Sequence, residues 1–443
     1  MDYIQITPAQ QRLMLREVGA ADIEDLLRQV PAEARCARPL NVPPALDEMS
    51  LREHLTALAA ANRCASETAC FLGFGAYDHY IPALVDRLAA RGEFVTAYTP
   101  YQPEASQGAL QAFFEFQTMV CQLTAMDISN ASLYDGATAV AEAALMALNV
   151  AGRRRLIVSA GVHPHYRRVL RTYLADLPAE YVDLPLEGGL TAPAGAAGLI
   201  DADTAAVIVQ SPNYLGIIED VPGIVAAAHA RGSLVIQAFN PVSLGLLRRP
   251  GETGVDIAAG EGQPLGIPLS FGGPYLGLFA CKSQFMRRMP GRLVGQTIDA
   301  AGRRAFCLTL QTREQHIRRE KATSNVCTNQ GLMALRAAIY MAAMGPHGLR
   351  RVAELCHAKA AYLARRLAQR GAVLPFADLP FFNELAVRPS RPVADVLRDA
   401  ADRGILAGVP LEQYDDRLDN CLLVAVTEKR SRAQIDALAE TLA

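Results

Sequence analysis

The sequence predicts an α/β protein whose main domain is a largely parallel β-sheet covered by helices on both faces. Between about residues 71 and 330, short runs of β-forming residues recur, and helical stretches separate several of them. Strands that alternate with helices in this way form right-handed βαβ units. The expected strands are 155–159, 181–184, 206–210, 234–239, 256–259 and 276–281, and the expected helices include 138–150, 165–174 and 224–231.

The two ends of the chain have other patterns. Residues 1–70 place apolar residues at helical spacing and Thr7-Pro8 is a favourable helix start, so we expect a helical arm with helices at 8–18, 21–30 and 50–61. After about residue 330 a long helical pattern breaks at Gly345-Pro346, and helices then alternate with strands. The predicted organisation is an arm over 1–70, a large α/β domain over 71–330 and a small α+β domain over 331–443.

Composition excludes several classes of protein. The 443-residue chain has a formal net charge of −2 and no block of Lys or Arg, which argues against nucleic acid or an anionic membrane as its main partner. Nine cysteines are scattered without a C-x-x-C pair, and no group of His and Cys has metal-ligand spacing. No apolar run approaches the roughly 20 residues of a membrane helix. We expect a soluble, cytoplasmic protein without a metal site.

One candidate for ligand binding is the segment Asp135-Gly136-Ala137-Thr138, which opens the expected helix 138–150. Free N–H groups at a helix N-terminus bind phosphate or another anion, and a glycine permits close approach of the ligand. An ordinary turn in which Asp135 caps the helix explains the same residues. A single glycine does not decide between these two interpretations.

Other candidates lie in three polar or glycine-containing segments. The loop at 98–104 contains two prolines and has no regular period, so it is either a rigid wall of a site or a plain surface loop. The run at 318–325 is either a site or a solvated stretch, and the glycine turn at 73–80 presents aromatic and imidazole groups. The side chains selected from these segments are His79, Tyr98, Tyr101, Gln102, Thr323, Ser324 and Asn325.

Five parts of the chain resemble one family in combination. They are GAYDHYIP at 75–82, TAYTPYQPE at 96–104, YDGAT at 134–138, GQPLG with SFGGP within 262–274, and KATSN at 321–325. Together they are similar, nearly from end to end, to the N-terminal or alpha-type half of the glycine decarboxylase (P-protein) family of the glycine cleavage system. The resemblance implies a fold-type I pyridoxal-phosphate architecture, with a seven-stranded large domain and a small C-terminal domain.

The sequence departs from such enzymes at two essential positions. The fold implies an aspartate at the pyridine nitrogen of the cofactor, but Gln237 stands at that place. It also implies a Schiff-base lysine near residues 260–266, where this chain has none. The resemblance therefore implies no catalytic residue in this chain and a vestigial cofactor site at Asp135, Gly136, Ala137, Thr138 and Gln237. Pyridoxal phosphate is expected to be bound covalently by a homologous, lysine-bearing second subunit.

The resemblance also implies a function for the complete enzyme. Glycine loses carbon dioxide on the cofactor, and the aminomethyl group passes to the lipoyl arm of the H-protein. This chain is expected to pair with the second subunit, two copies of each, and to wall the partner's pocket with the selected tyrosines, Gln102 and residues 323–325, with His79 behind them. The rivals are a self-sufficient aminotransferase that uses Lys321 or Lys282, and a non-enzymatic scaffold that binds the H-protein.

Overall fold

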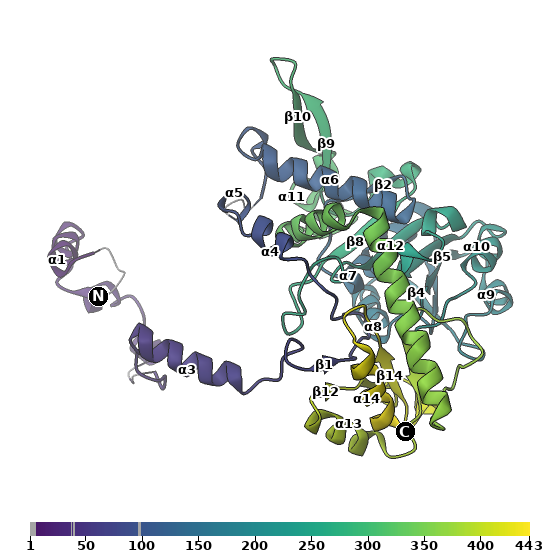
Figure 1. The fold of residues 1–443 in the computed structure, drawn as a ribbon. Helices are drawn as coiled ribbons and strands as arrows, with labels where there is room; N and C mark the ends of the chain where they lie inside the picture. Colours follow the sequence, from purple (N-terminus) through teal and green to yellow (C-terminus); the bar gives the residue numbers. More distant parts are fainter. Residues whose placement is uncertain (1–5, 37, 39, 96–98) are drawn as a thin grey trace. The chain divides into compact units, whose positions relative to one another are not determined.

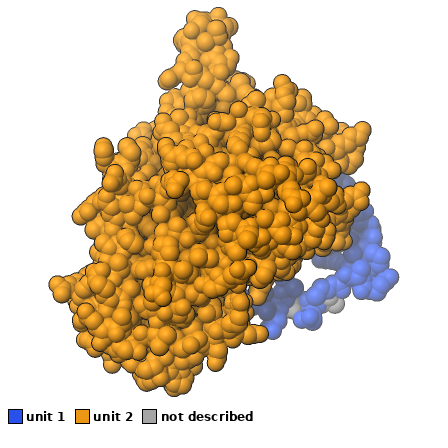
Figure 2. Space-filling view, turned by 90° about the vertical axis from the view of Figure 1, so that its right-hand side faces the viewer, with its two compact units in different colours: residues 1–63 blue, residues 64–443 orange. Residues whose placement is uncertain are grey.

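A computed structural model describes residues 6–36, 38, 40–95 and 99–443 and separates the chain into two compact units, 1–63 and 64–443 (Figure 2). The first unit contains the helices α1 (Pro8–Glu17), α2 (Ile23–Leu26) and α3 (Glu48–Ala60). The predicted cap at Thr7 is present, whereas α2 is shorter than the predicted helix 21–30. None of these three helices contains a buried residue. That residues 1–70 form a helical arm remains our proposal, supported by the exposure of these three helices.

The centre of the second unit is a seven-stranded sheet in the order β2-β8-β7-β6-β5-β3-β4. The strands β3 to β7 are mutually parallel, while β8 runs antiparallel to β7 and β2 antiparallel to β8. The predicted class and the mainly parallel sheet are confirmed. The strands are β2 (Ile128–Ser129), β3 (Arg155–Ser159), β4 (Glu180–Leu184), β5 (Thr204–Gln210), β6 (Leu234–Phe239), β7 (Ile257–Glu261) and β8 (Gly277–Cys281).

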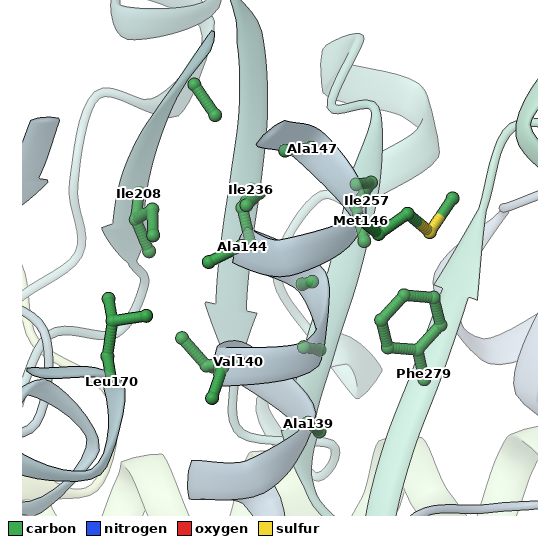
Figure 3. Close-up of a cluster of buried hydrophobic side chains, with 14 of the residues drawn as sticks. Ala139, Val140, Ala144, Met146, Ala147, Leu170, Ile208, Ile236, Ile257 and Phe279 are labelled. Atoms are coloured by element: carbon green, nitrogen blue, oxygen red, sulfur yellow. The ribbon is translucent and has the colours of Figure 1, made fainter. Parts of the chain in front are cut away.

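Helices cover both faces of this sheet, because alternate side chains of its buried strands point to opposite sides. On one face, α7 (Gly136–Ala151) and α8 (Pro164–Leu174) pack on the strands, and Ile236 and Phe279 meet the small residues of α7 (Figure 3). On the other face, Val235 packs with α9 (Pro193–Leu199) and α10 (Val221–His229). The alanine-rich sequence of α7 lets it lie close to the sheet, with its N-terminus at the carboxyl end of β7.

The C-terminal part contains a second buried cluster and a small antiparallel sheet. The long helix α12 (Gly331–Gln369) is interrupted at Gly345, whose φ of 61° and ψ of 179° are not helical, as the Gly345-Pro346 sequence predicts. The sheet has the order β11 (Glu384–Val387), β14 (Leu422–Ala425), β13 (Val409–Pro410), and α13 (Val393–Asp402) and α14 (Arg432–Leu442) pack with it. The short strand β1 (Ala69–Cys70) pairs with β12 (Ile405–Leu406) in the same region.

Several elements were not expected from the sequence. The hairpin of β9 (Leu293–Ile298) and β10 (Arg304–Thr309) projects from the second unit (Figure 1), and α6 (Gln107–Thr124) packs beside α12. The remaining helices are α4 (Ala83–Ala89), α5 (Gly92–Val95) and α11 (Gln315–Arg318). Among the described helices, none has the length and apolar character needed to cross a membrane. The division of 64–443 into a large and a small domain near residue 330 remains our proposal, supported by the separate buried clusters.

Candidate functional site

The N-terminus of α7 has the capping geometry that its sequence suggests. Asp135 is the N-cap, its carboxylate accepts a hydrogen bond from the Thr138 amide at 2.8 Å, and the Thr138 hydroxyl lies 3.1 Å from the Asp135 amide. Gly136 is the first helical residue and is buried, while Ala137 and Thr138 are half-buried. An added Cβ at Gly136 would lie 2.3 Å from Tyr166 Oη and 2.9 Å from Glu261, so only glycine fits. The capped turn expected from the sequence is therefore present. The free amide that could bind an anion faces an acidic side chain of the protein.

Glu261, the last residue of β7, supplies that acidic group. Its Oε2 atom accepts a hydrogen bond from the Gly136 amide at 2.9 Å. Its Oε1 atom accepts from the Gln263 amide at 2.8 Å and from the Leu276 amide at 3.1 Å. The residue is 8% exposed, and burial raises the pKa of this carboxyl to about 7, with the nearby Asp135 acting in the same direction. A protein carboxylate thus occupies the anion-binding end of α7.

A small cavity, which we call the Glu261 cavity, lies beside this carboxylate and has a volume of about 30 Å³. Such a space holds one or two water molecules. Glu384 is a second buried carboxyl in its wall, and it accepts hydrogen bonds from the Phe74 amide at 2.7 Å and the Tyr77 hydroxyl at 2.9 Å. Burial raises the pKa of Glu384 to about 7. The lining residues are Gly75, Tyr77, His163, Tyr166, Gln210, Pro212, Phe239, Asn240, Pro241, Glu261, Pro264, Asn383 and Glu384.

Aromatic rings pack tightly at one side of this cavity. The His163 ring lies 4.0 Å from the Phe74 ring and 5.0 Å from the Tyr166 ring, measured between centroids. His163 Nε2 is 3.0 Å from the Phe74 carbonyl oxygen, and burial lowers the pKa of this imidazole to about 3. The imidazole is therefore neutral at physiological pH and provides no positive charge for an anionic ligand.

Gln237 does not line the Glu261 cavity, although the resemblance groups it with the residues of α7. Its side chain is buried and faces a separate cavity of about 380 Å³, together with Ser211, Glu219 and Arg248. Its Oε1 atom has no hydrogen-bond partner among the described residues. The sequence alone does not reveal this difference, because it specifies the strand but not which cavity the Gln237 side chain lines.

None of the four lysines lines the Glu261 cavity. Lys282 Nζ lies 2.7 Å from Asp256 Oδ1 and donates to the Gly254 carbonyl at 3.0 Å. Lys359 Nζ donates to the Glu428 carbonyl, and Lys429 Nζ lies 2.6 Å from Asp78 Oδ1. Lys321 is exposed at the end of a short 3₁₀ turn. These positions agree with the absence of a Schiff-base lysine at 260–266.

His79 lies away from the Glu261 cavity, in a buried polar cluster with the C-terminal part of the chain. Its Nδ1 atom is 2.7 Å from Glu428 Oε2, which also accepts a weak hydrogen bond from Cys356 Sγ at 3.4 Å. The Tyr80 amide donates to Glu428 Oε1 at 2.6 Å. In the same turn, Asp78 pairs with Arg430 at 2.7 Å. This turn therefore anchors the segment after β1 to the C-terminal part.

Tyr101 belongs to a second group of side chains, which we call the Arg292 cluster: Tyr101, Arg292, Cys327 and Asn329. The buried Arg292 guanidinium donates to Tyr101 Oη at 3.1 Å, to the Cys327 carbonyl at 2.7 Å and to Asn329 Oδ1 at 3.3 Å. Half of the Tyr101 side chain remains exposed. Gln102 is exposed beside it, and Tyr98 lies outside the described residues. The predicted loop thus meets Cys327 and Asn329 at one arginine, and both of these residues lie after the predicted run 318–325.

Thr323 and Ser324 are half-buried and Asn325 is exposed. Thr323 and Ser324 line a cavity of about 20 Å³ with Arg313 and Glu314. Burial raises the pKa of the Glu142 carboxyl in α7 to about 7, and the nearby Ser324 side chain acts in the opposite direction. The Cys327 amide donates to Tyr134 Oη at 3.1 Å, next to the α7 N-cap. These residues lie along α7, but they share no cavity with Glu261.

Sequence reasoning missed Glu261 and Glu384 as site residues, and it singled out the turn at 73–80 without selecting Phe74. A signal for Glu261 was available, because an acidic residue at the end of an otherwise apolar strand (IAAGE) is unusual at a buried position. Glu384 offered a similar signal at the start of the apolar strand β11 (ELAV), but its partners could not be inferred from it. Its role depends on contact with residues 74 and 77, which lie more than 300 positions away in the chain.

The model of the family described as glycine cleavage system P-protein matches residues 1–442. The chain is 48% identical over 443 residues to a probable glycine dehydrogenase (decarboxylating) subunit 1 of Desulforamulus reducens, covering 100% of this chain and 99% of that relative. It is 50% identical over 438 residues to the corresponding protein of Moorella thermoacetica, covering 99% and 98%.

Solved structures agree with these relatives. A glycine decarboxylase (P-protein) of the glycine cleavage system, solved in an inhibitor-bound form, superposes with a TM-score of 0.92 at 48% identity and covers 100% of this chain and 99% of that one. A sphingosine-1-phosphate lyase of Burkholderia pseudomallei superposes with a TM-score of 0.68 at 15% identity, covering 93% of each chain. This second likeness concerns the fold alone and confirms the fold-type I architecture.

Proposed function

The chain belongs to the glycine cleavage system P-protein family, and from this premise we propose that it is subunit 1 of a glycine decarboxylase whose pyridoxal phosphate is held by a second, homologous subunit. The complete enzyme decarboxylates glycine and passes the aminomethyl group to the lipoyl arm of the H-protein. We place this complex, with two copies of each subunit, in the cytoplasm. In this proposal the chain supports the partner's chemistry and has no catalytic lysine of its own.

The observation that carries the proposal is the Glu261 cavity, which does not fit pyridoxal phosphate. Its volume of about 30 Å³ is far below the roughly 300–1,000 Å³ of ordinary ligand pockets. The Gly136 amide, which could hold a phosphate oxygen, already binds the Glu261 carboxylate. None of the chain's lysines lines the cavity, and Gln237 faces elsewhere. These features support the proposal that the cofactor chemistry belongs to the second subunit.

The Arg292 cluster supports a role for this chain in the partner's pocket. Arg292 is buried and holds Tyr101 through its hydroxyl and its ring, since the guanidinium carbon lies 5.2 Å from the ring centroid. A tyrosine fixed in this way, yet half exposed, is preorganised to contact another molecule. Asn325 and Gln102 are exposed beside these segments. We propose that these side chains, with Thr323 and Ser324, wall the active site of the second subunit.

An apolar groove on the second unit supports the association of the two subunits. It has a volume of about 920 Å³ and lies between α4, α6 and α12. Leu84, Leu88, Met119 and Ile339 are among its lining residues, and Leu84 is 50% exposed. Apolar side chains that line an exposed groove favour contact with another molecule. We propose that the homologous subunit covers this groove, because relatives of this chain bear the name subunit 1.

The rival aminotransferase has less support than this proposal. It needs a free lysine amine in a pocket, but Lys282 is paired with Asp256 and Lys321 lies on the surface. The rival scaffold, which only binds the H-protein, makes a different prediction. In that case the second subunit has full activity whether or not this chain is present.

The test is reconstitution from separately purified chains. Glycine-dependent exchange of carbon dioxide is expected only when this chain, the second subunit and lipoylated H-protein are all present. This chain alone, incubated with pyridoxal phosphate and dialysed, is expected to show no visible aldimine absorbance. A visible band that borohydride traps and that Lys321→Ala or Lys282→Ala abolishes would favour the aminotransferase. Full activity of the second subunit without this chain would favour the scaffold.

A further inference from the structure

We propose that the N-terminus of α7 is an anion-binding cup which this chain fills with its own Glu261 carboxylate, so that the side chain takes the place of a phosphate group. The occupant is visible in the structure, since the carboxylate is buried and accepts three backbone hydrogen bonds. The inference concerns binding by this chain alone and does not depend on what the assembled enzyme does.

The hydrogen bonds join three separate segments at one carboxylate. Gly136 is the first residue of a 16-residue helix, where unpaired amides and the helix dipole attract negative charge. Gln263 and Leu276 lie on the two sides of the loop that connects β7 to β8, and both of their amides point to Glu261 Oε1. A single carboxyl group thus ties the start of α7 to the ends of two strands, as a bound phosphate could.

Steric and electrostatic factors then exclude a second anion. The carboxylate oxygen lies 2.9 Å from the Gly136 nitrogen, so a phosphate oxygen cannot reach that amide. Glu384 provides a further carboxyl in the same wall, and the neutral His163 offers no compensating charge. Among the described residues, no lysine or arginine lines the cavity. An incoming phosphate would therefore lie beside two buried acidic side chains, Glu261 and Glu384. The cavity offers it only the space of one or two water molecules.

A glutamine at this position is not equivalent to the glutamate. In Glu261→Gln the new amide oxygen could still accept from two of the three backbone amides, but its NH₂ group would then face the third N–H. The Gly136 amide is expected to lose its partner in this variant, while the cup stays filled. In Glu261→Ala the cup loses its occupant, and the space of the side chain is added to the cavity.

The test uses the full-length chain and inorganic phosphate as the probe. Phosphate is expected to raise the thermal midpoint of Glu261→Ala saturably, with a Kd on the order of millimolar as for a site of a few backbone amides. The wild-type chain is expected to show no such rise. The matched control is Glu219→Ala, because Glu219 is also a buried acid with three hydrogen bonds but lines the separate cavity of Gln237. It is expected to gain no affinity for phosphate.

Hydrogen exchange of the Gly136 amide provides a second measurement that does not need the alanine variant to fold. Exchange at this amide is expected to be about tenfold faster in Glu261→Gln than in the wild type, the effect of one lost hydrogen bond. The proposal is overturned if Gly136 exchanges equally in both proteins. It is also overturned if a folded Glu261→Ala ignores phosphate, or if wild type and Glu219→Ala bind phosphate as well as Glu261→Ala does.

Discussion

Replacing Glu428 with glutamine tests the polar anchor between the segment after β1 and the C-terminal part. Burial opposes ionisation of Glu428, but the charge of His79 and their hydrogen bond lower the pKa of this carboxyl from 4.5 to about 2. A shift of this size corresponds to about 3 kcal/mol of unfolding free energy. The side chain is only 9% exposed, so solvent screens the pair weakly. Glu428→Gln is therefore expected to lower the unfolding free energy by up to about 3 kcal/mol, since the pair is a salt bridge only when His79 is protonated.

The lowered pKa of Glu428 also predicts how the free energy of unfolding changes with pH. A carboxyl whose pKa is lower in the folded protein stabilises it above the unfolded value of 4.5, and the stabilisation is lost as pH falls through about 2. Urea unfolding between pH 7 and 3 should therefore show a steeper loss of stability for the wild type than for Glu428→Gln, with the two curves converging at low pH. The matched control is Glu440→Gln, which removes an exposed pair with Arg370 and should change stability by less than about 0.5 kcal/mol. Equal effects of the two variants, or a difference between wild type and Glu428→Gln that does not shrink at low pH, would refute the reasoning.

Two further predictions concern the proposed function. The first uses Tyr101→Phe and Asn325→Ala, each reconstituted with unmodified second subunit. Both variants should assemble normally, and at least one should lower glycine-dependent carbon dioxide exchange by about tenfold or more. Full activity of both variants would show that these two side chains face solvent in the complex. Leu84→Asp should weaken association with the second subunit, measured by light scattering, because it places a charge in the apolar groove. Leu177→Asp, at a similarly exposed leucine outside the groove, should not weaken it.

Much of the fold follows from local sequence. The strands β3 and β6 have the predicted bounds, because RLIVS and LVIQAF are compact apolar runs between helical stretches. The hairpin β9–β10 was not predicted, since its exposed outer part mixes polar residues with the apolar Ile298 and supplies no clear alternation. The kink of α12 was predicted because a proline within a helix removes a backbone hydrogen bond and clashes with the preceding turn, so Gly345-Pro346 interrupts the helix.

The candidate site was less accessible from the sequence. The capped start of α7 follows from Asp135 and Thr138, which act over three residues. The placement of His79 beside Glu428 depends on a contact across 349 positions, and no local pattern specifies it. The missing lysine was evident from the sequence, whereas the carboxylate that replaces a ligand at Gly136 required the register of β7 against α7.

The central claim is that the cofactor of the complete enzyme is attached to the second subunit and not to this chain. The most direct measurement is borohydride reduction of the reconstituted complex with pyridoxal phosphate, followed by mass spectrometry of peptides from both subunits. The account predicts one pyridoxyl-lysine per pair of chains, located in the second subunit, with Lys282, Lys321, Lys359 and Lys429 of this chain unmodified. A stoichiometric pyridoxyl group on any of these four lysines would contradict it.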